Sequence, residues 1–262
     1  MQTEQLVMAV ALLAMVPVGA MGQAPQETGF LDRSVEVGGL AYRYQVYVPR
    51  GYDPAEAWPV ILFLHGSGER GSDGMRQTAV GIGSVLRWNP ERYPAIVVMP
   101  QSPADSSWQG DPAEAAMAAL AATEAELSTD PDRVYLTGLS LGGNGAWYLA
   151  YQHPDRWAAV VPVCGWVDRG GRLTVGPEEG EGSRFDRVAA RLADLPVWIW
   201  HGEMDDAVPV EESRQMAAAL EAAGADVRFT ELLGLGHNSW DAAYGSEAMA
   251  EWLFQQERGG GR

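Results

Sequence analysis

Hydrophobic positions along this chain fall into short runs of two kinds. Residues 40–49 alternate between apolar and polar side chains, which predicts a strand, and residues 33–39 form the other arm of a hairpin. Five later runs are apolar along most of their length and do not alternate, which is typical of parallel strands that are covered on both faces. These runs occupy residues 60–66, 95–100, 134–138, 158–165 and 197–202, and a last strand is predicted at 227–234.

Segments with helical patterns alternate with these strands, chiefly at residues 111–127, 210–224 and 246–256. Strands that alternate with helices predict the α/β class, with a doubly wound, mostly parallel sheet and helices on both faces. A single domain over residues 30–257 accounts for the pattern. Residues 168–186, which are rich in Gly and Glu, are predicted to form a surface loop.

The two ends of the chain differ from this domain. Leu6 to Val16 is apolar but too short to span a bilayer as a helix, and small residues follow it. We expect residues 1–22 to be a signal peptide, which implies a secreted or periplasmic protein without stable membrane insertion after processing. Because no Lys or Arg precedes the apolar run, an uncleaved apolar segment is the alternative. Residues 258–262, RGGGR, are expected to be a disordered tail.

Charge and composition exclude several classes of protein. The chain has 18 basic and 35 acidic residues and a net charge of −17, so nucleic acid is not expected as a partner. It contains no Lys, which excludes a Schiff-base enzyme, a Walker-type phosphate loop and a Ser–Lys hydrolase. One cysteine, Cys164, and the lack of CxxC or HExxH patterns predict no metal site. No cofactor is implied, and the oligomeric state stays open.

A sharp corner of small residues joins the strand at 134–138 to a helical pattern. Residues 138–142, GLSLG, match GxSxG, the pattern of a turn that lifts a serine hydroxyl, here Ser140, above the C-terminal edge of a sheet. Backbone N–H groups at the start of the next helix point to the same place. The pattern alone also suits a phosphate-binding turn or tight packing, but phosphate loops of this kind carry a lysine.

An acid and a histidine follow Ser140 in the order that such a serine requires. Asp205 lies just beyond the strand at 197–202, and His237 lies just beyond the strand at 227–234. Both are therefore expected at the same sheet edge as Ser140, where an imidazole can take the serine proton and a carboxylate can orient the imidazole. Taken singly, His237 could be a surface histidine and Asp205 a helix N-cap.

The motifs FLHGSGERG, GLSLGG, HGEMDDAVP and GHNSW together resemble the α/β-hydrolase superfamily. The resemblance covers about residues 42–254 and is nearest to compact single-domain serine carboxylesterases, a group that shades into acyl-thioesterase-like, feruloyl-esterase-like and prolyl-oligopeptidase-like relatives. It implies an α/β-hydrolase fold. No large cap domain is expected, because the chain after Cys164 reaches its next strand within about thirty residues. The cleft should then be open to a bulky or polymer-attached ester.

The resemblance also implies roles for single residues. The relatives' spacing HGxxDxxVP puts the acid at Asp205 and not at Asp206, and the N–H groups of Ser67 and Leu141 would form the oxyanion hole. His65 and His201 would hold loops in place, and His153 would be structural.

Two tryptophans, Trp108 and Trp240, follow strands at the sheet edge where Ser140 is expected, and they are candidates for the walls of a substrate pocket. Packing at the rim of the cleft is the alternative for both.

We therefore expect a serine hydrolase that cleaves carboxylic esters, among them feruloyl, acetyl or polysaccharide-linked esters, through an acyl-enzyme on Ser140. A serine peptidase of the prolyl-oligopeptidase type is one alternative, although this chain has no room for the propeller domain that is usual there. The other alternative is a non-catalytic binding module on a hydrolase scaffold. Such a module would typically have lost one of the three residues Ser140, Asp205 and His237.

Overall fold

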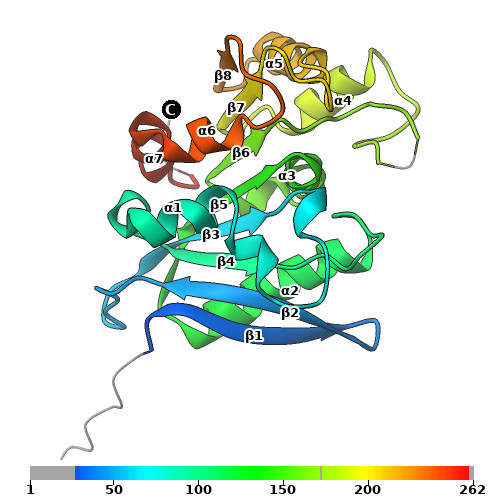
Figure 1. Ribbon diagram of the computed structural model, residues 1–262. Coiled ribbons are helices and arrows are strands. Elements are labelled where there is room, and N and C mark those ends of the chain that lie inside the picture. Colours follow the sequence, from blue (N-terminus) through cyan, green and yellow to red (C-terminus); the bar gives the residue numbers. More distant parts are fainter. Residues whose placement is uncertain (1–26, 172, 260–262) are drawn as a thin grey trace, which may run out of the picture.

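The computed structural model describes residues 27–171 and 173–259, and within this part eight strands form one sheet in the order β1-β2-β4-β3-β5-β6-β7-β8 (Figure 1). Strands β3 to β8 run parallel to one another, while β2 is antiparallel to both of its neighbours. The predicted mostly parallel sheet is confirmed. The strands are β1 (Gly29–Val37), β2 (Leu40–Val48), β3 (Trp58–Leu64), β4 (Ile96–Pro100), β5 (Thr129–Leu139), β6 (Ala159–Val163), β7 (Val197–Gly202) and β8 (Val227–Leu232).

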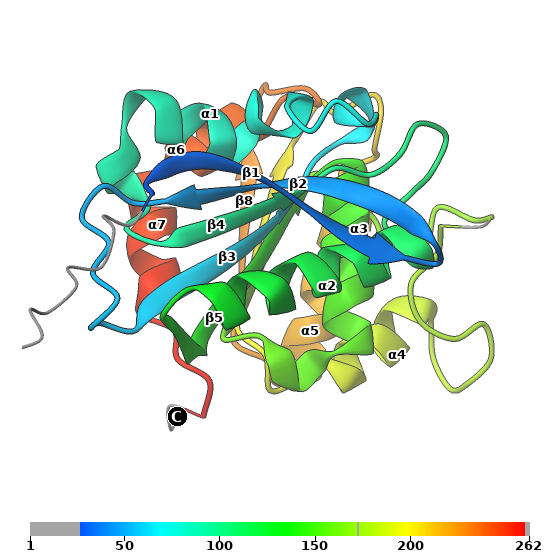
Figure 2. The same ribbon diagram turned by 90° about the horizontal axis from the view of Figure 1, so that it is seen from below.

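Helices cover both faces of this sheet, as Figure 2 shows. Helices α2 to α5 lie on one face, and α1, α6 and α7 lie on the other. The helices are α1 (Gly81–Trp88), α2 (Asp111–Glu126), α3 (Leu141–Gln152), α4 (Arg184–Arg191), α5 (Glu211–Ala222), α6 (Trp240–Gly245) and α7 (Glu247–Phe254). The layered arrangement confirms the doubly wound α/β fold.

Each face of the sheet has its own hydrophobic core, because successive strand residues point to opposite sides. In β3, Val60, Leu62 and Leu64 join the core under α2 to α5, whereas Ile61 and Phe63 join the core under α1, α6 and α7. All five are fully buried, which explains why the strand is apolar throughout its length.

Three helices were not among the elements predicted from the sequence: α1, α4 and α6. Helix α4 begins inside the segment predicted to be a loop, 168–186. Its start is a capping box, in which the Ser183 hydroxyl accepts from the Asp186 N–H and the Asp186 carboxylate accepts from the Ser183 N–H. Helix α4 packs beside α5 and does not form a cap over the sheet edge.

Parallel strands bring their carboxyl ends to a single edge, which we call the carboxyl edge. In the register of the sheet, Gly138 lies opposite Leu64 of β3, and Gly202 of β7 lies opposite Leu232 of β8. The loops that follow β3 and β5 therefore begin side by side at this edge, as do the loops that follow β7 and β8.

The ends of the chain are only partly described. The predicted signal peptide, residues 1–22, and the last three residues, 260–262, lie outside the described residues. Arg258, where the disordered tail was predicted to begin, is held in place: its guanidinium binds Asp132 and the Asp155 carbonyl, and its N–H donates to the Asp132 carbonyl. Among the helices of residues 27–171 and 173–259, none is both long and apolar enough to cross a membrane.

Candidate active site

Ser140 occupies a strained backbone turn between β5 and α3. Its φ is 53° and its ψ is −115°, a conformation that residues with a side chain rarely adopt and that costs about 1–3 kcal/mol. The turn is held from both sides, because the Ser140 N–H donates to the Val163 carbonyl at 2.9 Å and the Ser140 carbonyl accepts from the Asn144 N–H at 3.0 Å. The hydroxyl is thereby lifted above the sheet.

Glycine is required on both sides of this serine. A methyl group at Gly138 would overlap the Gly142 carbonyl, and one at Gly142 would overlap the carbonyl oxygen of Leu64 in the neighbouring strand. The first turn of α3 thus lies directly against the end of β3, at a distance that no residue larger than glycine allows.

Asp205, His237 and Ser140 form a continuous chain of hydrogen bonds. His237 Nε2 lies 2.9 Å from Ser140 Oγ, and His237 Nδ1 lies 2.7 Å from Asp205 Oδ2. An ionised carboxylate can only accept, so Nδ1 carries the proton and Nε2 is free to accept from the serine hydroxyl. The Asp205 side chain is fully buried, while the imidazole remains 25% exposed and can be reached by a substrate.

The loops that carry the acid and the histidine meet through their backbones. The Met204 N–H donates to the Leu235 carbonyl at 2.8 Å, and a side chain at Gly202 would overlap the Gly236 carbonyl. This contact brings residues 32 positions apart in the sequence within hydrogen-bonding distance.

Asp205 and its neighbour Asp206 have different environments. Besides the bond to His237, the Asp205 carboxylate accepts from the N–H groups of Ala207 and Val208, at 2.9 and 2.8 Å. Asp206 is exposed to solvent. Only the first of the two acids is thus directed toward the imidazole.

The two N–H groups predicted for the oxyanion hole belong to the first residues of two helical turns. Ser67 begins a 3₁₀ turn over Ser67–Glu69, and Leu141 begins α3. A backbone N–H at such a position has no acceptor within its own helix and is available to an anion.

His65 and Trp108 hold the loop that carries Ser67. His65 Nε2 accepts from the Ser102 N–H at 3.0 Å, so Nδ1 carries the ring proton and donates to the Gly66 carbonyl at 2.6 Å. The Trp108 indole donates to the His65 carbonyl at 2.9 Å and packs on Gly145 of α3.

Of the two tryptophans predicted to line the pocket, the structure places Trp108 in the core and not at the cleft. It is 1% exposed, because its ring fills the space between His65 and α3. Trp240 is partly exposed, and its ring meets the His237 imidazole edge to face at 5.4 Å between centroids.

One group of potential metal ligands in the described residues coincides with this site. The ligand atoms of Cys164, Asp205 and His237 lie within 4.8 Å of one another. Burial raises the pKa of the Cys164 thiol to about 12, whereas a metal requires the thiolate. The other two side chains already bond to each other, so the donor set favours a proton-transfer site over a metal site.

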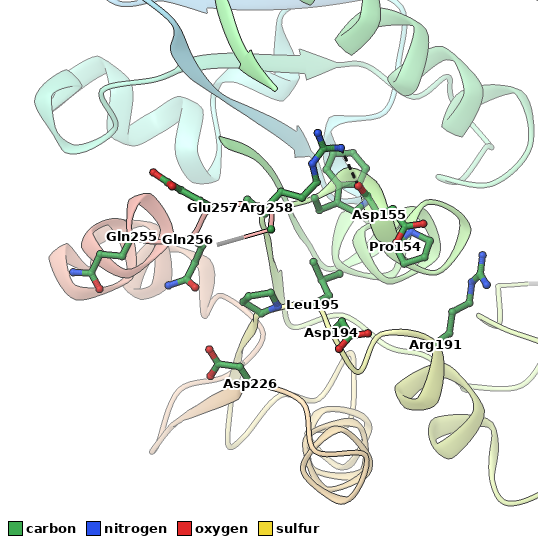
Figure 3. A pocket seen from close by; sticks show the side chains of 14 residues that line it. Pro154, Asp155, Arg191, Asp194, Leu195, Asp226, Gln255, Gln256, Glu257 and Arg258 are labelled. Atoms are coloured by element: carbon green, nitrogen blue, oxygen red, sulfur yellow. Dashed lines mark hydrogen bonds between the residues drawn. The ribbon is translucent and has the colours of Figure 1, made fainter. Parts of the chain in front are cut away.

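A hollow of about 700 Å³ lies at the opposite edge of the sheet, where β6, β7 and β8 begin (Figure 3). Its lining mixes Arg191 and Arg258 with acids such as Asp155 and Asp226. Ligands of open α/β sheets bind at the carboxyl ends of the strands, so this hollow is not the substrate site.

Comparison with known proteins agrees with this geometry. The family model described as "Putative esterase" matches residues 38–241. A poly(3-hydroxyoctanoate) depolymerase of Pseudomonas fluorescens is 28% identical over 233 residues, which are 77% of this chain and 76% of that protein. The crystal structure of a thermostable esterase is 31% identical, superposes with a TM-score of 0.75, and matches 87% of this chain and 63% of its own.

An uncharacterized secreted protein of Arthroderma benhamiae is 26% identical over 213 residues, or 71% of this chain. The match spans only 22% of that longer protein. This chain therefore corresponds to part of some of its relatives.

The burial of His65 predicts a pH-dependent stability. Burial lowers the pKa of His65 to about 4, below the 6.5 of the unfolded chain. Between pH 6.5 and 4 the unfolded chain binds the extra proton, so the free energy of unfolding falls as the pH falls, by about 3 kcal/mol from this group at pH 4.

Urea unfolding at several pH values, for the wild type and for His65→Gln, measures this effect. The glutamine keeps an acceptor for the Ser102 N–H but does not titrate, so its stability should fall less steeply over this range. Parallel curves for the two proteins would contradict the assignment.

Proposed function

This chain belongs to the "Putative esterase" family within the α/β-hydrolase superfamily, and on that premise we propose that it hydrolyses carboxylic esters through an acyl-enzyme on Ser140. The observation that carries the proposal is the position of His237, bonded to Ser140 through one ring nitrogen and to Asp205 through the other. No cofactor takes part in this reaction.

The geometry supports a two-step mechanism. His237 Nε2 takes the Ser140 proton as Oγ attacks the ester carbonyl carbon, and the buried Asp205 carboxylate stabilises the imidazolium that forms. The carbonyl oxygen becomes an oxyanion, which the N–H groups of Ser67 and Leu141 bind. Each such donor typically lowers the barrier by about 3 kcal/mol.

His237 then donates this proton to the alcohol oxygen of the ester as the bond from the carbonyl carbon to that oxygen breaks. The alcohol leaves, and the acyl group remains on Ser140. In the second step a water molecule gives a proton to His237 and attacks the acyl carbon. His237 then gives that proton to Ser140 Oγ as the bond from the acyl carbon to Oγ breaks, which releases the acid and restores the serine.

We further propose that the substrate is a bulky or polymer-attached ester. In the described residues, the segment between β6 and β7 contains only the short α4, which packs beside α5. The loops that carry Asp205 and His237 also present exposed apolar side chains: Met204 is 67% and Leu233 is 78% exposed. A depolymerase among the relatives supports the same class of substrate.

Parallel assays on soluble p-nitrophenyl esters and on an emulsified aliphatic polyester test this substrate class. We expect both to be cleaved, without a jump in rate when a soluble ester passes its solubility limit, because no large lid has to open. A protein that cleaves only the soluble esters would contradict the polymer assignment.

The proposal separates this chain from two alternatives. A prolyl-oligopeptidase-type peptidase would cleave amides, whose amine is a poorer leaving group, so matched ester and amide substrates distinguish the two. A binding module would lack a reactive serine, and here the Ser140 hydroxyl is already bonded to an imidazole.

We also propose that residues 1–22 direct export, in agreement with the relative described as secreted. Sequencing of the mature N-terminus tests this, and a protein that keeps Met1 would contradict it.

Replacement of the nucleophile should abolish turnover and leave the fold intact. We expect Ser140→Ala to lower kcat at least about 10⁴-fold and to prevent labelling by a fluorophosphonate probe. Ser34→Ala makes the same chemical change on an exposed residue of β1 and serves as the control. Retention of more than a tenth of the wild-type activity in Ser140→Ala would refute the nucleophile.

The two adjacent acids should differ sharply. Asp205→Asn allows the wrong imidazole tautomer and should lower kcat by about 10⁴-fold, whereas Asp206→Asn should change it less than about tenfold. The measurement is the rate of ester hydrolysis at pH 8, with circular dichroism to show that both variants fold. A reversed order of the two variants would show that the acid is Asp206.

A further inference from the structure

A second histidine bonds to the catalytic acid. His201, the second-to-last residue of β7, is completely buried, and its Nε2 lies 3.1 Å from Asp205 Oδ2 and 2.9 Å from the Val208 carbonyl oxygen. Its Nδ1 lies 2.7 Å from the hydroxyl of Ser213 in α5, which is also buried. The bonded side chains thus run without a break from Ser213 to Ser140.

The partners of His201 decide its protonation. Nε2 faces a carboxylate and a carbonyl, which can only accept, so Nε2 carries a proton. Burial lowers the pKa of His201, so the ring is neutral and Nδ1 accepts from the Ser213 hydroxyl. Charged or titratable groups that interact with the ring are Asp205, His237 and, on β8, Glu231.

We propose that His201 is a positioning residue of the active site, whose Nε2–H holds Asp205 Oδ2 toward His237, and that Ser213 fixes the tautomer in which it can do so. The proposal rests on the proposed ester hydrolysis. His201 therefore has a role beyond holding a loop in place, because it binds the same carboxylate oxygen that accepts from His237.

The carboxylate needs such a partner. Asp205 Oδ1 is held by two backbone N–H groups, but Oδ2 has only the two imidazoles among its described partners. The neighbours Met204 and Asp206 are exposed, so the side chains on either side of Asp205 do not hold the loop in the core. Without the Nε2–H of His201, the one described partner left to Oδ2 would be His237, the imidazole that Oδ2 is meant to orient.

Two substitutions of His201 separate positioning from packing. A glutamine amide nitrogen can reach the place of Nε2, whereas the shorter asparagine amide reaches only the place of Nδ1. We expect His201→Gln to keep kcat within about fivefold of the wild type. His201→Asn should lower kcat about 10- to 100-fold with KM changed less than about threefold, the effect of losing one hydrogen bond to a charged group.

The pH profile supplies a readout that a packing role would not move. Without a donor on Oδ2, the negative charge of Asp205 is less dispersed and favours the protonated form of His237. The acid-side midpoint of kcat/KM should therefore move to higher pH in His201→Asn and stay in place in His201→Gln. His153→Asn, at an exposed histidine after α3, is the control and should behave as the wild type.

Two outcomes would overturn the proposal. One is an equal loss of kcat in both His201 variants with the acid-side midpoint of kcat/KM unchanged. The other is a wild-type kcat in His201→Asn. If circular dichroism shows that His201→Asn does not fold, Ser213→Ala decides, since it keeps the ring and removes only the hydroxyl. We expect kcat to fall about two- to tenfold there, and an unchanged kcat overturns the proposal. Fluorophosphonate labelling of the wild type reports separately on the proposed function.

Discussion

Close approach of backbones, possible only at glycine, is the constraint on which this site depends. Gly142 brings α3 against the end of β3, Gly143 and Gly165 bring α3 against the loop after β6, and Gly202 meets Gly236 beneath the acid and the histidine. A side chain at Gly142, Gly143, Gly165 or Gly202 would overlap the backbone that faces it. Ser140, Asp205, His237 and the loop that carries Ser67 therefore converge at one place, where His65 and Trp108 add side-chain hydrogen bonds to the backbone contacts.

A carboxylate buried at this place needs hydrogen-bond donors that compensate its negative charge. Asp205 meets this requirement with two backbone N–H groups and two imidazoles, and its side chain is closed to water. The same bonds that compensate for burial also fix the direction of the carboxylate. Electrostatic stabilisation of the site and orientation of the base thus come from one set of contacts.

The two edges of the sheet have separate roles. The carboxyl edge gathers Ser140, Asp205 and His237 and exposes apolar loop residues such as Met204 and Leu233. The opposite edge contains a hollow lined by charges of both signs, near the point where Arg258 fixes the C-terminal segment. A scaffold of this kind can change its substrate by changing the loops of one edge while the other edge maintains the fold.

The sequence by itself determined the strands, the α/β class and the candidates Ser140, Asp205 and His237, because these depend on local patterns: apolar runs, glycines at fixed spacing and the order of three residue types. Helix α4 was not predicted because its signal in the sequence is a single capping box in a polar segment. Helix α6 was not predicted because it is only six residues long. Only the tertiary structure decided which side chains share a contact. Trp108 is buried because α3 folds over it, and the ring of His201 is held in the core by a bond to Ser213 of α5, twelve residues further on. Burial and hydrogen-bond partners depend on segments distant in sequence, and no local pattern records which segments will meet.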